Sequence, residues 1–213
     1  MKVKKFTFNG FQENTYIVSD ELKNCVIIDP GCYETHEKET LFQYIEKEQL
    51  TPVALLNTHA HIDHVMGNAA VLEKYPIDFY LHSEDIPTLH AVAGYAHLYG
   101  FPGYIPSPSP TKILKGGETL KFGEIEFDVI FGPGHAPGHV AFYSSKHNFV
   151  INGDILFQGS FGRVDLPGGD IETLKETIFE KMFKLPEDTL VYCGHGSETT
   201  IGTEKKSNMI LNY

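Results

Sequence analysis

The chain has 213 residues, of which 41% are hydrophobic and 21% are charged, a composition typical of one soluble globular domain. Its 28 acidic residues outnumber 17 basic ones, so the formal net charge is −11, and Arg163 is the single arginine. We expect neither nucleic acid nor a membrane surface as a partner, because both are bound through clusters of cationic side chains.

The start of the chain and the cysteines indicate where the protein works. No apolar run approaches the roughly 20 residues that a membrane-spanning helix needs. The first residues, MKVKKFTFNGFQEN, lack the apolar core of a signal peptide and indicate a strand instead. Three cysteines, Cys25, Cys32 and Cys193, form no CxxC pair, so we expect no disulfide framework. These features predict a cytoplasmic protein.

The first part of the chain alternates strands and helices. A helix is predicted within 35–49, where apolar residues recur at helical spacing, and another at 65–75. Short apolar or alternating runs predict strands at residues 3–8, 15–19, 25–29, 53–58 and 78–82.

Residues 94–111 are rich in Gly, Pro, Tyr and Ser, and we expect a long surface loop there. A helix is predicted at 170–185 with Asp170 as its N-cap, and another near the end of the chain. Further strands are predicted at 113–122, 125–131, 140–145, 148–153 and 189–193. Two strand-rich halves with interspersed helices favour an α+β architecture of two sheets with helices outside.

The sequence THAHIDH at residues 58–64 carries the strongest chemical signal. His59 and His61 are two residues apart at a strand end and point the same way in extended backbone. Asp63 and His64 follow in the turn, and their side chains can reach a position close to those of the two histidines. Imidazole and carboxylate groups are ligands of zinc and iron. One histidine alone is usually a surface residue, but four such groups within six positions predict a metal site.

One cluster cannot complete two coordination spheres, so further ligands are expected at other strand ends. His139, Asp154 and His195 each follow a glycine at the start or end of a predicted strand. Glycine lets the backbone turn sharply and approach a crowded centre. Each of these residues alone would be interpreted as a loop residue, but together with the first cluster they indicate metal ligands.

The order HxHxDH, His, Asp, His resembles the metallo-β-lactamase fold superfamily over nearly the whole chain. The segments ENTYIV, GRVDLPGGD and GHGSETTIGTEKKSN are similar to its glyoxalase II-like hydrolases. The resemblance implies a four-layer αββα sandwich of two mixed sheets, formed by residues 1–213 as a single domain. It also implies two divalent ions, with zinc expected and iron or manganese as alternatives.

The resemblance further assigns a role to each ligand. His59, His61 and His139 would hold the first metal, and Asp154 would bridge to the second. The remaining ligands of the second metal would be Asp63, His64 and His195, while Asp29 would support them without binding metal. Asp63 would also orient the attacking hydroxide.

The implied activity is hydrolysis of a small thioester or ester by a metal-activated hydroxide, as in hydroxyacylglutathione hydrolase. Glyoxalase II adds a C-terminal helical region that grips glutathione, and only 18 residues follow His195 (213 − 195), so we expect no such region. A mononuclear iron persulfide dioxygenase of the same fold is the alternative. The sequence leaves the oligomeric state open.

Two further residues lie close to these ligands in the sequence. His135 and His139 both follow a glycine, but only His139 runs directly into a predicted strand. We therefore expect His139 to be the ligand, and His135 to bond to a neighbour or line the pocket. Arg163 is a candidate for binding a substrate carboxylate, although pairing with Asp165 or Asp170 is the more ordinary role of such a residue.

Overall fold

The computed structural model describes residues 1–213 and contains two mixed six-stranded sheets with helices. The expected α+β class is therefore confirmed. The chain forms two compact units: unit 1 comprises residues 1–114 and 121–125, and unit 2 comprises 115–120 and 126–213. None of the helices combines the length and apolar character needed to cross a membrane.

The sheet of unit 1 has six strands that lie in chain order: β1 (Lys2–Phe8), β2 (Glu13–Ser19), β3 (Asn24–Ile28), β4 (Thr51–Leu56), β5 (Asp78–His82) and β6 (Lys112–Leu114). The first three strands are antiparallel, whereas β3, β4, β5 and β6 run parallel. The carboxyl ends of the parallel strands therefore meet at one edge of the sheet.

The edge strand β1 carries three lysines, Lys2, Lys4 and Lys5, at exposed or half-buried positions. Lys2 forms an ion pair with Glu48 at 2.9 Å, and its ammonium lies 5.5 Å from the ring centre of Tyr44. Lys4 lies 5.2 Å from the ring of Phe6. The lysine stems thus cover aromatic surface while their charges stay in water.

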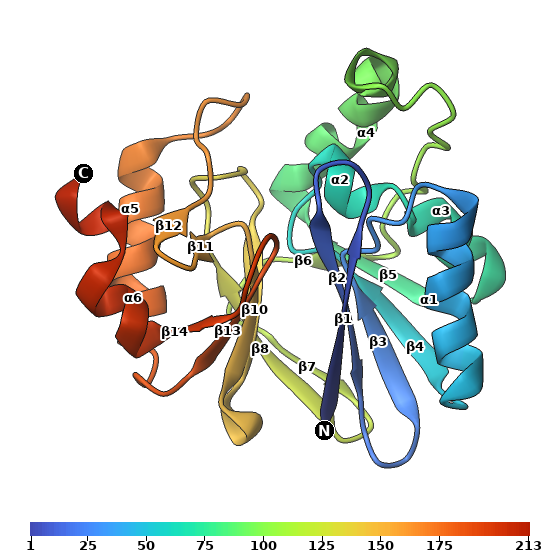
Figure 1. Ribbon diagram of the computed structural model, residues 1–213, viewed down its shortest axis with the longest axis horizontal. Helices are drawn as coiled ribbons and strands as arrows, with labels where there is room; N and C mark the ends of the chain where they lie inside the picture. Colours follow the sequence, from blue (N-terminus) through green and yellow to red (C-terminus); the bar gives the residue numbers. More distant parts are fainter. The chain divides into compact units, whose positions relative to one another are not determined.

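Four helices belong to unit 1: α1 (Thr35–Lys47), α2 (Ile62–Val65), α3 (Asn68–Lys74) and α4 (Ile86–Tyr95). Figure 1 shows α1 lying along the sheet of this unit. Their buried apolar side chains share one core with the strands, including Leu41, Ile45, Val71, Leu89, Ile27, Leu55 and Phe79.

The predicted loop at 94–111 is in part helical. Helical structure continues through α4 and the 3-10 helix η2 (Ala96–Tyr99), and Gly100 ends it in a left-handed conformation with φ 89°. Residues 101–111 are irregular, as expected. The many Gly and Tyr residues hide the helix in the sequence, although Pro87 in its first turn is a typical helix-start residue.

The second sheet has the order β14-β13-β10-β9-β8-β7, with bounds β7 (Thr119–Phe122), β8 (Ile125–Phe131), β9 (Val140–Ser144), β10 (Phe149–Gly153), β13 (Leu190–Cys193) and β14 (Thr199–Thr200). β10 and β13 are parallel, and β9 is antiparallel to both β8 and β10. The ends of β8, β10 and β13 and the start of β9 therefore meet at one edge. A small hairpin, β11 (Leu156–Phe157) and β12 (Ser160–Phe161), follows β10.

The helices of unit 2 are α5 (Ile171–Glu180) and α6 (Ile201–Ser207), which lie beside its sheet in Figure 1. The Asp170 side chain accepts a hydrogen bond from the Thr173 N–H, so its predicted role as N-cap is confirmed. Leu174 and Ile178 of α5 pack on Val150 of the sheet. The remaining short helices are η1 (Ser83–Asp85), η3 (Ser145–His147), η4 (Met182–Lys184) and η5 (Met209–Asn212).

Candidate metal centre

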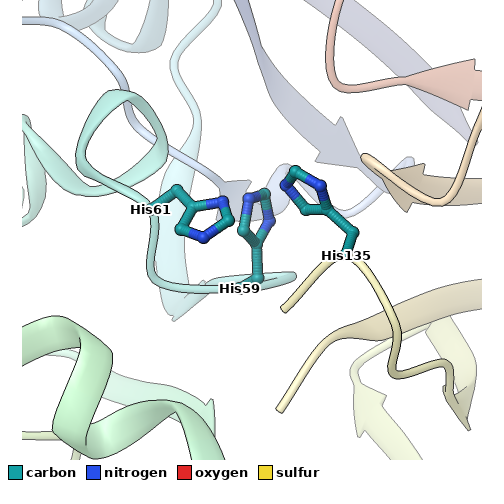
Figure 2. A group of neighbouring side chains, drawn as sticks. All are labelled: His59, His61 and His135. Carbon is teal, nitrogen blue, oxygen red and sulfur yellow. The ribbon is translucent and has the colours of Figure 1, made fainter. Parts of the chain in front are cut away.

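In unit 1, the predicted ligands lie where the parallel strands end. β4 ends at Leu56, and the chain then runs through His59 into α2, whose N-cap is His61. The ring centres of His59 and His61 are 4.8 Å apart, and those of His59 and His64 are 4.1 Å apart. All three histidines are buried, which is unusual for imidazoles without a binding role. Figure 2 shows the rings of His59 and His61 side by side.

A carboxylate at the end of the neighbouring strand orients these histidines. Asp29 directly follows β3 and has a φ of 48°, a conformation that Asp tolerates better than most residues. Its Oδ1 accepts the backbone N–H of Thr58 at 2.7 Å, and its Oδ2 accepts the Thr58 hydroxyl at 2.6 Å. The same Oδ2 lies 3.2 Å from His64 Nδ1. His64 therefore presents its Nε2 on the other side of the ring.

Sequence reasoning missed two residues that hold the backbone of this cluster. Asp85 accepts the Ala60 N–H at 2.6 Å through Oδ2 and fixes the segment between the first two histidines. The Asn9 amide donates to the main-chain oxygens of Asp63 at 3.1 Å and Gly31 at 3.0 Å. In the sequence, Asn9 is typical of a turn and Asp85 of a helix start, so neither pattern indicates support for a metal site.

Gly31 lies at a point where the backbone leaves no room for a side chain. A Cβ there would lie 2.1 Å from Glu13 Oε2 and 2.5 Å from the Asp63 main-chain oxygen. Glu13 is fully buried, and its Oε1 is 3.9 Å from His64 Nδ1. Burial raises the pKa of the Glu13 carboxyl well above its usual range, although the charge of His64 opposes the shift. A second carboxyl group therefore lies behind His64, together with Asp29.

In unit 2, Asp154 directly follows β10 and stands between two histidines. Its Oδ2 lies 3.5 Å from Nε2 of His135 and 3.4 Å from Nε2 of His195. His195 directly follows Gly194 at the end of β13, the strand parallel to β10. One carboxylate oxygen thus faces an imidazole nitrogen on each side, an arrangement suited to a carboxylate that contacts two cations.

The hydrogen bonds of the two histidines favour His135 as the metal ligand, whereas the sequence favours His139. Nδ1 of His135 lies 2.7 Å from the Arg163 carbonyl oxygen, which can only accept, so Nδ1 donates and Nε2 keeps its lone pair. Nε2 of His139 instead accepts the Asp154 backbone N–H at 3.0 Å. His139 is fully buried and supports the main chain of Asp154. Figure 2 shows His135 on the loop between β8 and β9.

Arg163 contributes to this half of the site through its backbone, whereas its side chain points to a neighbouring acid. The guanidinium binds Asp165 in bidentate fashion, with Nε–Oδ1 and Nη2–Oδ2 distances of 2.7 Å. This pair is largely exposed. Gly162, the preceding residue, allows the close approach, because a Cβ there would lie 1.9 Å from the Asp154 carbonyl oxygen and 2.9 Å from His135 Nδ1.

The donors of both units fit divalent metal ions. His64 and His135 are each oriented by an oxygen at Nδ1, as metal-bound histidines usually are. The set contains only imidazole and carboxylate groups, the ligands of zinc, iron and manganese. Cys193 offers no competing thiolate, because burial and the charge of Asp154 raise the pKa of its thiol to about 12. All three cysteines are buried and unbridged.

The family model of the metallo-beta-lactamase superfamily matches residues 8–195. The chain belongs to this superfamily. Its members are generally metal-dependent hydrolases. The expectation drawn from HxHxDH and the downstream ligand letters is thereby confirmed at the level of the family.

Relatives match the chain over its whole length. It is 40% identical to the probable metallo-hydrolase YqgX of Bacillus subtilis, covering 100% of this chain and 98% of that protein. It is 36% identical to the hydroxyacylglutathione hydrolase GloC of Haemophilus influenzae, covering 100% and 99%. Among solved structures, the BLEG-1 B3 metallo-beta-lactamase is 39% identical with a TM-score of 0.90 and full coverage of both chains. A di-iron-bound form of TTHA1623 is 38% identical with a TM-score of 0.87, covering 97% and 98%.

Proposed function

We propose that the protein is a cytoplasmic dinuclear metal-dependent hydrolase that cleaves small thioesters or esters. The observation that carries this proposal is the position of Asp154, whose Oδ2 faces the Nε2 atoms of both His135 and His195. Full-length similarity to GloC supports thioesters as the substrate class. We also propose that residues 1–213 act as one domain, because the metallo-beta-lactamase family model matches residues 8–195 and so includes parts of both units.

The proposed ligand set differs from the sequence-based set at one position. We assign His59, His61 and His135 to the first metal, with His135 in place of His139. Nε2 of His139 already accepts a backbone hydrogen bond, whereas Nε2 of His135 keeps its lone pair and faces Asp154. Asp63, His64 and His195 are assigned to the second metal, with Asp154 shared between the two.

Two bound divalent ions would supply a water of lowered pKa and polarise the substrate carbonyl. Asp63 would be the carboxylate that accepts the proton of that water and orients it for attack on the carbonyl carbon. Its main-chain oxygen is held by Asn9, and it lies 3.8 Å from His64 Nε2 through its Oδ2. Asp29 keeps His64 in the tautomer with Nδ1 protonated. The chain needs no serine or cysteine nucleophile for this reaction.

We propose zinc as the metal, with iron or manganese as alternatives, because the donor set accepts all three. The di-iron form of TTHA1623 supports iron as the main competitor. A mononuclear iron persulfide dioxygenase of the same fold remains the alternative function. The substrate is expected to be a small molecule, and Arg163 is not proposed to bind it, since Asp165 already occupies its guanidinium.

Metal quantification followed by a substrate panel tests the proposal. The protein, prepared anaerobically, is expected to saturate at about two ions per chain and to hydrolyse S-lactoylglutathione or a non-glutathione acetyl thioester. His195→Ala should lose part of the metal and most activity, whereas His36→Ala, at an exposed position on α1, should change neither. Saturation at one iron with oxygen uptake on glutathione persulfide would favour the dioxygenase. Turnover of a β-lactam alone would contradict the thioester assignment.

A further inference from the structure

The small hairpin of unit 2 lies next to all three candidate ligands of that unit. β11 follows closely after Asp154 in the chain. The ring of Phe157 in β11 lies edge-on to the ring of His195, with 6.0 Å between the ring centres. Beyond β12 comes Arg163, whose carbonyl oxygen accepts the Nδ1–H of His135 at 2.7 Å. A displacement of this hairpin would therefore reach both histidines through the contacts that orient them.

The C-terminal part of the chain holds this hairpin by its backbone. Gly159 forms the turn with φ 71° and donates its N–H to Glu204 Oε2 at 2.8 Å. The side-chain amide of Asn208 donates to the main-chain oxygens of Phe157 at 3.2 Å and Ser160 at 2.8 Å. β11, the turn and β12 thus each have a backbone group bonded to α6 or to the residue directly after it.

Glu204 is a fully buried acid whose hydrogen-bond partners are all neutral. Its Oε2 also accepts the Asn208 amide at 2.6 Å, and its Oε1 accepts the Thr199 hydroxyl. Burying a carboxyl group without a cation costs stability, and these hydrogen bonds offset that cost. A fully bonded polar network holds its members in one arrangement, and here the arrangement that it fixes is that of the hairpin.

The ordinary roles of polar residues at helix ends explain only part of this network. The N-cap of α6 is Thr200, which accepts the Thr203 N–H, so Glu204 is not needed as a cap. Asn208 caps η5 by accepting the Ile210 N–H at 2.9 Å, but it does so through Oδ1 alone. Its amide nitrogen serves the hairpin and Glu204 instead.

We propose that Glu204 and Asn208 are positioning residues of the metal centre, which hold the β11–β12 hairpin so that His135 and His195 are fixed for metal binding. This inference rests on the proposed ligand set. The two residues act at a distance, through the backbone beyond β12 on one histidine and through the aromatic ring of β11 on the other. The end of the segment GHGSETTIGTEKKSN thereby has a role that its histidine does not explain.

Nuclear magnetic resonance of the metal-free protein tests this positioning without any catalysis. With isotopically labelled histidine, the His135 Nδ1–H should give a resonance shifted downfield by its bond to the Arg163 carbonyl, and His135→Gln assigns that resonance by its loss. The resonance should persist in Glu204→Gln, because the glutamine oxygen can accept the Gly159 N–H. It should be lost in Glu204→Leu and in Asn208→Asp, which keeps the cap of η5 but loses the amide donors.

Thr189→Val is the matched control for the loss of a buried hydrogen bond. The buried Thr189 hydroxyl donates to Asn148 Oδ1 at 2.8 Å. These two residues directly precede β13 and β10, at the opposite ends of the strands from His195 and Asp154. The control should lower stability and leave the His135 resonance unchanged. A urea unfolding curve for each variant establishes that it is folded under the conditions of the measurement.

Metal affinity supplies the second readout. Each proposed metal has one histidine that the hairpin orients, so both ions should bind more weakly when the hairpin is released. In competition with a chromophoric chelator, the Kd for zinc should rise about tenfold in Glu204→Leu and Asn208→Asp, as is usual when a group that orients a ligand is lost. In Glu204→Gln and Thr189→Val, it should stay within about twofold of the wild type, since the hairpin keeps its bonds.

An unchanged His135 resonance and an unchanged zinc affinity in folded Glu204→Leu or Asn208→Asp would overturn the positioning role. Equal losses in Thr189→Val would also overturn it, because the effect would then follow stability alone. Losses in Glu204→Gln as large as in Glu204→Leu would show that the hydrogen bond to the turn is not what matters. If the resonance depends on Glu204 in a protein that hydrolyses no thioester, the positioning role stands and only the proposed function is contradicted.

Discussion

His135 and His139 belong to the same short loop, and only their hydrogen bonds distinguish them. The sequence Gly134-His135-Ala136-Pro137-Gly138-His139 contains two equivalent Gly-His pairs, so the spacing cannot say which ring faces the metal site. The side of the ring that is engaged depends on the Arg163 carbonyl, 28 residues away from His135 in the chain. Such long-range backbone contacts leave no local signal in a single sequence.

This distinction predicts that His135→Ala loses about half of the bound metal, whereas His139→Gln keeps it. The glutamine amide oxygen can accept the Asp154 N–H in place of His139 Nε2. Metal content per chain, measured by mass spectrometry after dialysis, checks both variants, with His36→Ala as the control for losing an imidazole. Metal loss in His139→Gln together with retention in His135→Ala would restore the assignment made from the sequence.

Glu13 predicts a pH dependence of stability. Its pKa is raised in the folded state, so its stabilising contribution is complete below the pKa of the unfolded chain, about 4.3. This contribution is lost as the pH rises toward the folded-state pKa, because the unfolded chain then releases a proton that the folded chain keeps.

Glu13→Gln removes this ionisation, and its unfolding midpoint in urea should rise relative to the wild type as the pH increases from 4 to 8. The comparison uses metal-free protein, so that pH-dependent metal binding does not contribute to the difference in stability. Glu39→Gln, at an exposed position on α1, should show no such trend. A constant difference between Glu13→Gln and the wild type at every pH would show that the pKa of Glu13 is the same in the folded and unfolded chains.

The secondary structure elements show why the sequence can locate the strand ends that carry the candidate ligands. Strands β3 and β4 are short apolar runs, and β10 and β13 are similar, so their ends can be located from the sequence. Within each sheet, the parallel pair brings its two carboxyl ends to one edge of that sheet. Helix α4 was missed because its residues 93–95, Ala-Gly-Tyr, have no apolar period, and it is stabilised instead by burial of Leu89 and Val92 in the core.

Gly162, in the loop after β12, is a position where one added methyl group should lower the stability of the protein. Gly162→Ala places a Cβ against the Asp154 carbonyl oxygen and beside His135 Nδ1, so the backbone must move. Overpacking of this kind costs about 1–3 kcal/mol of stability. We expect a lower free energy of unfolding in urea and weaker metal binding.

Gly94→Ala is the matched control, because a Cβ at this helical position meets nothing within 4 Å. It should leave metal binding unchanged and keep or raise stability, since alanine favours helix more than glycine does. Wild-type metal affinity in Gly162→Ala would mean that the loop can shift without disturbing His135.

At the scale of the whole molecule, proposed metal ligands occur in each unit, so metal binding should stabilise each of them. Unit 1 contributes His59, His61, Asp63 and His64, and unit 2 contributes His135, Asp154 and His195. A ligand present at 100 times its Kd stabilises the folded state by about 2.7 kcal/mol.

Calorimetry with and without metal should therefore show one unfolding transition that moves to higher temperature when metal is added. His61→Ala in unit 1 and His195→Ala in unit 2 should each lose most of the shift. His36→Ala should keep it. Two separate transitions in the metal-loaded wild type, of which only one responds to metal, would contradict the assignment of metal ligands to both units.

The lysines of β1 bear on a different property, the resistance of the folded protein to aggregation. An edge strand presents unpaired backbone groups to which a strand of another molecule can add. Lys2 is paired with Glu48, but the exposed Lys4 adds a positive charge to this edge, which disfavours the edge-to-edge approach of a second copy. Because the same side chains also cover Tyr44 and Phe6, neutralising them would remove the repulsion and uncover apolar surface at once. The edge that lies farthest in the sheet from β6 is thus the place where a loss of charge would first promote self-association.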